Sequence, residues 1–155
     1  MKKIILFSLI IFIIDQFIKL FIGFGIDLNS SITIFKNFFY ISNVHNYGAA
    51  FSILYGNRIF LVVISIFALV FVYHFMLKNK VFRHIDVAIY SLLIGGILGN
   101  LFDRIIYGYV VDYLDFYIFG YSFPIFNLAD ICIVCSVIII VLDALRGDFN
   151  AVKGK

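Results

Sequence analysis

The segment Gly95-Gly-Ile-Leu-Gly-Asn-Leu-Phe-Asp-Arg104 closes a long apolar run with a row of polar side chains. Gly95 and Gly99 are four residues apart, so in a helix they leave one face bare and let a neighbouring backbone approach closely. Asn100, Asp103 and Arg104 follow at i, i+3 and i+4, which places them on one helix surface. Two interpretations stay open: a packing seam that ends in a solvated ion pair, or a polar shelf that orients other carboxylates.

The chain around this segment is apolar enough to lie almost entirely in a membrane. Of its 155 residues, 64% are hydrophobic and 14% are charged, and the mean hydropathy is +1.10. A helix needs about 20 apolar residues to cross the hydrocarbon core. Segments that meet this need run over residues 4–22, 59–77, 87–106 and 125–145. The sequence therefore predicts one membrane-embedded domain, residues 1–155, with four transmembrane helices and an all-α class.

The basic residues predict the orientation of these spans. Those that precede the first span, lie between the second and third, or follow the fourth are Lys2, Lys3, Lys78, Lys80, Arg83, Arg146, Lys153 and Lys155. The other two connections carry only Lys36, Arg58 and Arg104. Because cytoplasmic loops are enriched in Lys and Arg, we expect both termini in the cytoplasm and the first and third connections outside. The net charge of +3 comes from these flanks, and their scatter does not favour nucleic-acid binding.

The first span also resembles the start of a secretory signal peptide, because Met1-Lys-Lys precedes an apolar run. Asp15, Gln16 and Lys19 interrupt that run, so we expect a retained span. Asp15 and Lys19 stand at i and i+4 and can pair on one helix face. Whether this pair fixes helix packing or faces a substrate stays open at this point.

The two outer connections have the pattern of short strands. Alternating or β-branched and aromatic side chains predict strands over residues 31–36, 38–44 and 109–113. Asn46-Tyr-Gly is typical of a turn, and residues 120–124 indicate a second turn. We also expect a short helix at the membrane interface over residues 49–54, where aromatic rings would sit at headgroup depth.

Asp112 lies in a predicted strand of the second outer connection and Asp130 near the start of the fourth span, so both are expected at the outer face. An ionised side chain at the bilayer centre costs roughly 2.5–3.5 kcal/mol on insertion scales, so acidic residues near the lipid need a reason. We expect Asn127 to cap the fourth helix, which puts Asp130 in its first turn, where the helix dipole favours the ionised form. If Asp112 comes within hydrogen-bonding distance, the two carboxyl groups would share one proton near neutral pH. Aspartic proteases use this state: one carboxylate deprotonates a water while the other protonates the scissile carbonyl.

The cysteines and histidines do not favour redox or metal chemistry. Cys132 and Cys135 lie in the fourth span, and we expect both to pack there as small apolar residues. His45, His74 and His84 are spread over three segments with no metal-ligand spacing.

Five motifs, in order along nearly the whole chain, resemble the lipoprotein signal peptidases, the bacterial signal peptidase II group of intramembrane aspartic proteases. The motifs are Asp15-Gln-x-x-Lys19, Asn46-x-Gly-Ala-Ala-Phe51, Gly99-Asn-x-x-Asp-Arg104, Val110-Val-Asp112 and Phe126-Asn-x-Ala-Asp130. One such motif is a weak signal, whereas five in order between four spans are specific. Tyr113 departs from the family, which usually has Phe at this place; we expect little consequence because the aromatic ring is kept.

The resemblance implies an endopeptidase that removes the signal peptide from diacylglyceryl-modified prolipoproteins by cutting just before the lipid-modified cysteine. It implies Asp112 and Asp130 as the catalytic pair and no metal or other cofactor. The supporting polar residues that it implies are Asp15, Lys19, Asn46, Asn100, Arg104 and Asn127. The implied fold adds a small extracytoplasmic β-cradle and a short interfacial amphipathic helix to the four spans. The implied setting is a monomer in the bacterial inner membrane, with prolipoproteins and membrane lipid as partners and the site near the outer face.

Two other classes of protein stay open on the residues alone. Intramembrane Asp, Lys and Arg also mark ion- or proton-coupled transporters. A transporter would more often show internal repeats, discontinuous spans or polar groups near mid-membrane, whereas most polar residues here gather at the outer ends of the spans. A structural or assembly subunit would leave Asp112 and Asp130 as ordinary loop and cap residues.

Overall fold

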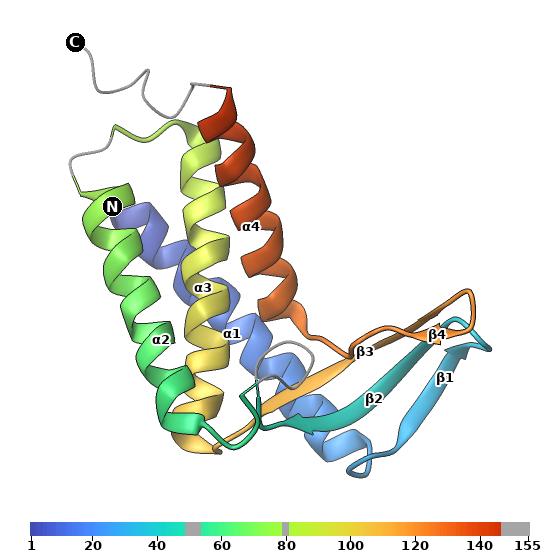
Figure 1. The fold of residues 1–155 in the computed structure, drawn as a ribbon. Helices are drawn as coiled ribbons and strands as arrows, with labels where there is room; N and C mark the ends of the chain where they lie inside the picture. Colours follow the sequence, from blue (N-terminus) through green and yellow to red (C-terminus); the bar gives the residue numbers. More distant parts are fainter. Residues whose placement is uncertain (49–53, 79–80, 147–155) are drawn as a thin grey trace.

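The computed structural model describes residues 1–48, 54–78 and 81–146. Within these residues, four apolar helices stand together and a small antiparallel sheet projects from one end of the bundle (Figure 1). The helices are α1 (Lys2–Gly25), α2 (Arg58–Phe71), α3 (His84–Ile106) and α4 (Leu128–Leu145), and a π-helical turn, η2 (Val72–Leu77), continues α2. Each is long and apolar enough to cross a membrane, with α2 and η2 taken together. The predicted spans are confirmed as helices of a multi-pass membrane protein.

α3 is the central helix of the bundle. In its apolar segment 61% of the residues are buried inside the protein, against 22% in α1, 11% in α2 with η2, and 17% in α4. It packs against all three of these helices. The core between them contains Ile4, Val72, Leu77, Tyr90, Leu93 and Ile97. Large apolar side chains on the outer surfaces, such as Ile13, Phe67 and Val134, stay exposed and suit contact with lipid.

Glycines on α3 explain its close packing. An added Cβ at Gly95 would lie 2.7 Å from a side-chain carbon of α1, and one at Gly96 would lie 2.6 Å from the Ala129 carbonyl oxygen of α4. Gly99 leaves room for the Asp15 carboxylate of α1. The predicted glycine seam is confirmed at Gly95 and Gly99, and Gly96 adds a contact with α4 that the four-residue spacing did not reveal.

The fourth helix starts later than predicted. It begins at Leu128 rather than at residue 125, because Asn127 is its N-cap, as expected. The Asn127 side chain accepts from the Asp130 N–H at 3.0 Å, and the Asp130 carboxylate accepts from the Asn127 N–H at 3.2 Å, which closes a capping box. Phe126, just before the cap, pairs with Leu114 of the sheet and so extends the strand structure up to the helix.

The sheet has the strand order β1-β2-β3-β4, with every neighbouring pair antiparallel. Its strands are β1 (Ser31–Phe35), β2 (Phe39–Asn46), β3 (Val110–Ile118) and β4 (Tyr121–Ser122). The three expected strands are confirmed, and β3 is longer than predicted. The turn expected over residues 120–124 is wrong for Tyr121 and Ser122, which pair with β3; the chain reverses at Phe119 and Gly120, both at positive φ. The all-α class therefore describes only the membrane part of the fold.

The two faces of the sheet carry different side chains. In β2, Ser42 and Asn43 stand where β3 has the single residue Tyr113, which makes a bulge. Because side chains alternate along a strand, Asp112 of β3 points to one face and Val111 to the other. The first face belongs to the cluster of polar residues described below, and the second face looks onto α1.

Two further expectations have other outcomes. The interfacial helix expected over residues 49–54 falls largely on residues 49–53, which lie outside the described part of the chain; Leu54 is in a turn. Cys132 is buried in α4 as expected, but Cys135 is exposed. Packing against the bundle is therefore confirmed for Cys132 only; for Cys135, on the outer surface of the apolar span, the role of a small apolar residue stays a prediction.

Candidate active site

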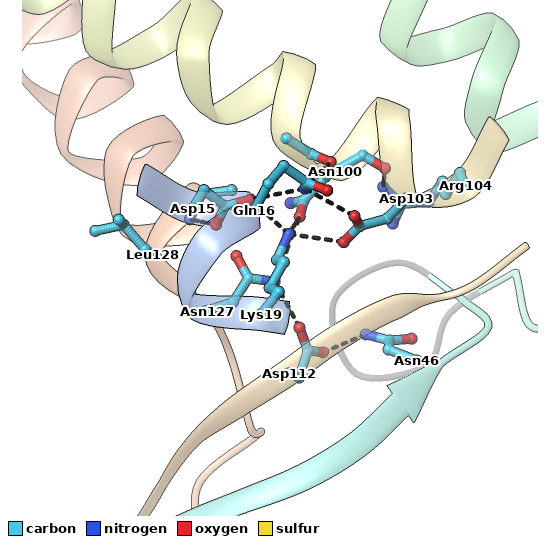
Figure 2. Close-up of polar contacts among 12 residues, drawn as sticks. Asp15, Gln16, Lys19, Asn46, Asn100, Asp103, Arg104, Asp112, Asn127 and Leu128 are labelled. Atoms are coloured by element: carbon cyan, nitrogen blue, oxygen red, sulfur yellow. Dashed lines mark hydrogen bonds and ion pairs between the residues drawn. The ribbon is translucent and has the colours of Figure 1, made fainter. Parts of the chain in front are cut away.

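Polar side chains from helices and strands converge where the bundle meets the sheet (Figure 2). The residues that the sequence predicted for the site are Asp15 and Lys19 of α1, Asn100 and Arg104 of α3, Asn46 of β2, Asp112 of β3, the cap Asn127, and Asp130 of α4. The structure brings all of them into one network of hydrogen bonds and ion pairs.

Asp112 is the most enclosed carboxyl group at the sheet end of this network. It is 3% exposed. The Asn46 Nδ2 donates to its Oδ2 at 2.8 Å, and the Asn127 Nδ2 donates to its Oδ1 at 2.6 Å. Burial, followed by the negative charge of Asp130, raises the pKa of Asp112 from 3.8 to about 7, although the two amide donors act in the opposite direction. A carboxyl group in this position holds a proton near neutral pH.

Asp130 has a different environment. It lies in the first turn of α4, where the helix dipole favours a negative charge. Its Oδ1 accepts from the Asn100 Nδ2 at 2.7 Å, and its Oδ2 accepts from the Asn127 N–H at 3.2 Å. The two carboxyl groups thus have different surroundings, and acid–base catalysis by a pair of carboxyl groups needs such a difference.

Two amides connect these carboxyl groups. The Asn127 Nδ2 that reaches Asp112 also lies 3.3 Å from the Asn100 Oδ1, and the Asn100 Nδ2 donates to Asp130. The Asn127 oxygen is held in turn by the Asp130 N–H, so neither amide can rotate without losing partners. The sequence could not establish that Asp112 and Asp130 meet; the chain of contacts through Asn127 and Asn100 places them in one site.

Lys19 is the centre of a buried ion cluster behind the pair. Its Nζ lies 2.8 Å from the Asp15 Oδ2, 2.8 Å from the Asp103 Oδ2 and 3.0 Å from the Asn100 Oδ1. These three contacts use all the donors of an ammonium group. Because Lys19 and Asn127 both donate to the Asn100 oxygen, the NH2 group of Asn100 must point at Asp130. The expected pairing of Asp15 with Lys19 is confirmed.

Asp103 and Gln16 belong to the same cluster, although the sequence did not mark them as site residues. The Gln16 Nε2 donates to the Asp103 Oδ1 at 2.8 Å. Asp103 is 1% exposed and pairs with Lys19, so the interpretation as a solvated ion pair on α3 is wrong. The sequence carried one signal for Asp103, its place with Asn100 and Arg104 on one surface of the helix, but no local rule named Lys19 as its partner.

Arg104 links the cluster to the turn after β2. Its Nη2 donates to the Gly48 carbonyl at 3.0 Å, and its Nη1 donates to the Asn100 carbonyl at 3.3 Å. The Gly48 N–H donates to the Asn46 Oδ1 at 2.9 Å, so Arg104 holds the turn that presents the Asn46 amide to Asp112. The expected turn at Asn46 is confirmed.

Tyr113 and Asp15 fix the start of α4 from two sides. The Tyr113 hydroxyl accepts from the Leu128 N–H at 3.1 Å, and the Asp15 Oδ1 accepts from the Ala129 N–H at 3.0 Å. A phenylalanine at position 113 could not accept this hydrogen bond. The departure of Tyr113 from the family pattern therefore adds a contact to the N-terminus of the helix that carries Asp130.

The acidic groups of the site are occupied by protein donors. Lys19 engages Asp15 and Asp103, while amides engage Asp112 and Asp130. In the part of the chain that the structure describes, no group of three or more His, Cys, Asp or Glu side chains is arranged to hold a metal ion.

A comparison with known proteins agrees with this geometry. The family model described as signal peptidase (SPase) II matches residues 7–146. The chain belongs to the signal peptidase II family. Enzymes of this family are aspartic proteases, and two carboxyl groups in one site are what such chemistry requires. Membership of the signal peptidase II family argues against the transporter and assembly-subunit alternatives.

Lipoprotein signal peptidases and two solved structures resemble the chain over most of its length. The lipoprotein signal peptidases of Staphylococcus aureus strains JH9 and Newman are each 37% identical over 146 residues, which cover 94% of this chain and 90% of theirs. A bacterial membrane enzyme determined by the in meso method at 2.3 Å resolution superposes with a TM-score of 0.86 at 34% identity, covering 100% of this chain and 94% of its own. A second such structure, at 1.9 Å, gives a TM-score of 0.82 at 36% identity, covering 94% of each chain.

Proposed function

We propose that this protein removes the signal peptide from diacylglyceryl-modified prolipoproteins, cutting just before the lipid-modified cysteine, with Asp112 and Asp130 as its catalytic pair. The observation that carries the assignment of residues is the asymmetry of the two carboxyl groups. Burial raises the pKa of Asp112 to about 7, whereas Asp130 lies at the positive end of α4. The substrate class follows from the family and from the lipoprotein signal peptidases that the chain resembles.

The reaction begins with Asp130 ionised and Asp112 protonated. Asp130 takes a proton from a water molecule while the oxygen of that water attacks the scissile carbonyl carbon. At the same time Asp112 gives its proton to the carbonyl oxygen. In the second step Asp130 donates the proton it received to the leaving nitrogen. Asp112 recovers a proton from one hydroxyl of the tetrahedral intermediate, the C–N bond breaks, and both carboxyl groups return to their starting states.

The supporting residues orient this pair. Asn100 and Asn127 hold the two carboxyl groups by short hydrogen bonds, and we assign Lys19 the role of fixing the Asn100 amide rather than of binding substrate. Arg104 keeps Asn46 on Asp112 and adds a positive charge beside the pair. These roles need no metal ion or other cofactor.

The proposed setting is a monomer in the bacterial inner membrane, with both termini in the cytoplasm and the pair near the outer face. The excess of Lys and Arg at the termini and between α2 and α3 supports this orientation. A substrate whose cleavage site is held at the membrane surface needs carboxyl groups at that depth. The sheet beside Asp112 is proposed to cradle the extended chain of the prolipoprotein around the bond that is cut.

A gel-shift assay in detergent with a diacylglyceryl-modified prolipoprotein tests the proposal. With EDTA present throughout, we expect cleavage by the wild type and a loss of about a thousandfold or more in Asp112→Asn and in Asp130→Asn. Asp115→Asn is the matched control, because Asp115 is also a buried carboxyl group of β3 but lies outside the hydrogen-bond network of the pair. It should retain cleavage.

Folding and insertion of each variant are checked by its melting temperature and its elution in size-exclusion chromatography. Cleavage that persists in either Asp112→Asn or Asp130→Asn would overturn the assignment of the pair. No cleavage by a well-folded wild type would overturn the substrate class.

A further inference from the structure

A groove with a volume of about 770 Å³ runs along α1 on the side of the sheet that Asp112 does not face. Val111 and Tyr109 of β3 line it, and the alternation of side chains directs Asp112 away from it. α1 lines it with Phe12, Phe17, Leu20 and Gly23 among others. The groove thus lies across the sheet from the face on which Asn46 and Asn127 hold Asp112, and Lys19 and Asp103 of the buried ion cluster are among its lining residues.

The groove has the length of one membrane leaflet. From Phe12 to Gly23 the helix rises by about 16 Å at 1.5 Å per residue. Half of a hydrocarbon core of about 30 Å is close to this value. At the deep end, the rings of Phe12 and Phe102 meet at 5.4 Å between centroids and close the groove. Its walls near this end are apolar and could follow a single acyl chain.

The other end of the groove is aromatic. Phe102 contacts Tyr107 at 6.3 Å between ring centroids, Tyr107 contacts Tyr109 at 6.0 Å, and Tyr109 stacks on His45 at 3.7 Å. These rings form a continuous ladder from the deep end to the sheet. Desolvation lowers the pKa of His45 below its ordinary value of 6.5, so its imidazole is neutral at pH 7. The faces of such rings attract cations.

The charges of the lining as a whole favour a positive group, and Asp27 lies beyond the end of α1. The groove is lined by two aspartates, Asp27 and Asp103, and by one lysine, Lys19, which is already paired with Asp103 and with Asp15 behind it. Asn43 also lines the groove; its Nδ2 donates to the Ile26 carbonyl at 2.7 Å, while its Oδ1 has no hydrogen-bond partner among the described residues. The lining therefore carries more negative than positive charge. The Asn43 Oδ1 is itself buried, so it adds negative character behind the groove surface and does not contact a bound group.

We infer that this groove binds a membrane lipid whose headgroup carries an ammonium group, with one acyl chain lying along α1. The ammonium group meets the aromatic ladder and Asp27, and the apolar walls between Phe12 and Gly23 hold the chain. The excess of carboxylates disfavours an anionic headgroup. Such a lipid would rest between α1 and the sheet, on the side opposite to the catalytic pair.

Lipid retention measured by native mass spectrometry tests this inference. The delipidated protein in detergent is mixed with equal amounts of phosphatidylethanolamine and phosphatidylglycerol that have the same acyl chains. We expect the wild type to retain phosphatidylethanolamine over phosphatidylglycerol by about fivefold, the effect of one cation held by aromatic rings and a carboxylate.

Two glycines of α1 provide a matched pair of variants. An added Cβ meets nothing within 4 Å at either Gly23 or Gly25, and only Gly23 lines the groove. Both substitutions by leucine should fold, because leucine favours a helix more than glycine does. Gly23→Leu fills the groove and should lower phosphatidylethanolamine retention severalfold, whereas Gly25→Leu should retain it as the wild type does.

Asp27→Asn tests the contribution of the lipid headgroup separately from that of the acyl chain. Asp27 is exposed beyond the end of α1, so its substitution leaves the fold intact. We expect retained lipid but a phosphatidylethanolamine preference that falls towards one. Equal retention of the two lipids by the wild type, or unchanged retention in Gly23→Leu, would overturn the inference. So would an equal loss in Gly23→Leu and Gly25→Leu.

Discussion

Asp112 accepts hydrogen bonds from two amides, and as the proposed catalytic acid it would set the upper limit of the pH range. Burial and the charge of Asp130 raise its pKa to about 7. Below this pH, Asp112 is protonated and can act as the acid; as the pH rises through about 7, it loses that proton. We therefore expect kcat/KM to fall on the alkaline side with a midpoint near 7, measured on a diacylglyceryl-modified peptide over a series of buffers.

A substitution at Asn46 tests whether Asp112 causes the alkaline fall of kcat/KM. Its hydrogen bond lowers the pKa of Asp112, so Asn46→Ala should raise that pKa further and move the alkaline midpoint to higher pH. Asn57→Ala is the control, because Asn57 is exposed at the start of α2 and caps no N–H group with its side chain. A midpoint that stays in place in Asn46→Ala would assign the alkaline limb to a group other than Asp112.

Lys19 balances two buried carboxylates, so its removal should be costly. Lys19→Met would leave Asp15 and Asp103 facing each other without a cation, and breaking a buried ion pair in this way costs about 3–5 kcal/mol of unfolding free energy. Lys2→Met on the same helix removes an exposed charge and should leave the stability within about 0.5 kcal/mol of wild type. Unfolding in detergent compares the two, and equal stability would show that the cluster contributes little.

The sequence predicted individual site residues better than it predicted their partners. Asp15 and Lys19 could be paired in advance, because i and i+4 positions meet on any helix. Asp103 could not be paired with Lys19 in advance, because Lys19 lies on α1 and no spacing rule relates two residues so far apart in the sequence. For the same reason, the contact of Asn100 with Asp130 required the packing of α3 on α4 to be known.

At the scale of elements, glycines on α3 let the neighbouring helices approach its backbone closely. A Cβ added at Gly96 would lie 2.6 Å from the backbone oxygen of Ala129, which cannot move without α4. Gly96→Ala should therefore lower the unfolding free energy by about 1–3 kcal/mol, as overpacking does. Gly25→Ala, where the space is open, should not lower it. The two melting temperatures in detergent check this, and a Gly96→Ala protein as stable as wild type would contradict the close contact.

The existence of each helix and of the longer strands could be predicted, because hydrophobic length and side-chain alternation are local properties. The start of α4 was predicted by Asn127 as a cap and not by the apolar span, which begins at residue 125; the hydrogen bond with Asp130 confirms the cap. The strand β4 could not be predicted. Tyr121 and Ser122 are a strand because β3 offers them partners, not because their sequence requires it.

At the scale of the whole molecule, the position of the charged residues predicts how the protein lies in its membrane. With Cys132 and Cys135 changed to alanine, Lys36→Cys should react with a membrane-impermeant maleimide added outside spheroplasts, and Lys2→Cys only after lysis. Both lysines are exposed. The reverse labelling pattern would place the pair at the inner face. The cysteine-free background should keep its turnover, because neither cysteine takes part in the hydrogen-bond network of the pair.

The alternation of side chains along β3 limits how the connection between α3 and β3 can change in evolution. Gly108 turns the chain at φ +84, and Asp112 follows four residues later with its carboxyl group on the catalytic face. Deleting or inserting one residue between them would turn that carboxyl group towards the groove along α1 and bring an apolar neighbour to the reacting bond. The hairpin at Phe119 and Gly120 lies outside this constraint, whereas a single-residue gap before Asp112 would take the proposed catalytic carboxyl group away from Asn46 and Asn127.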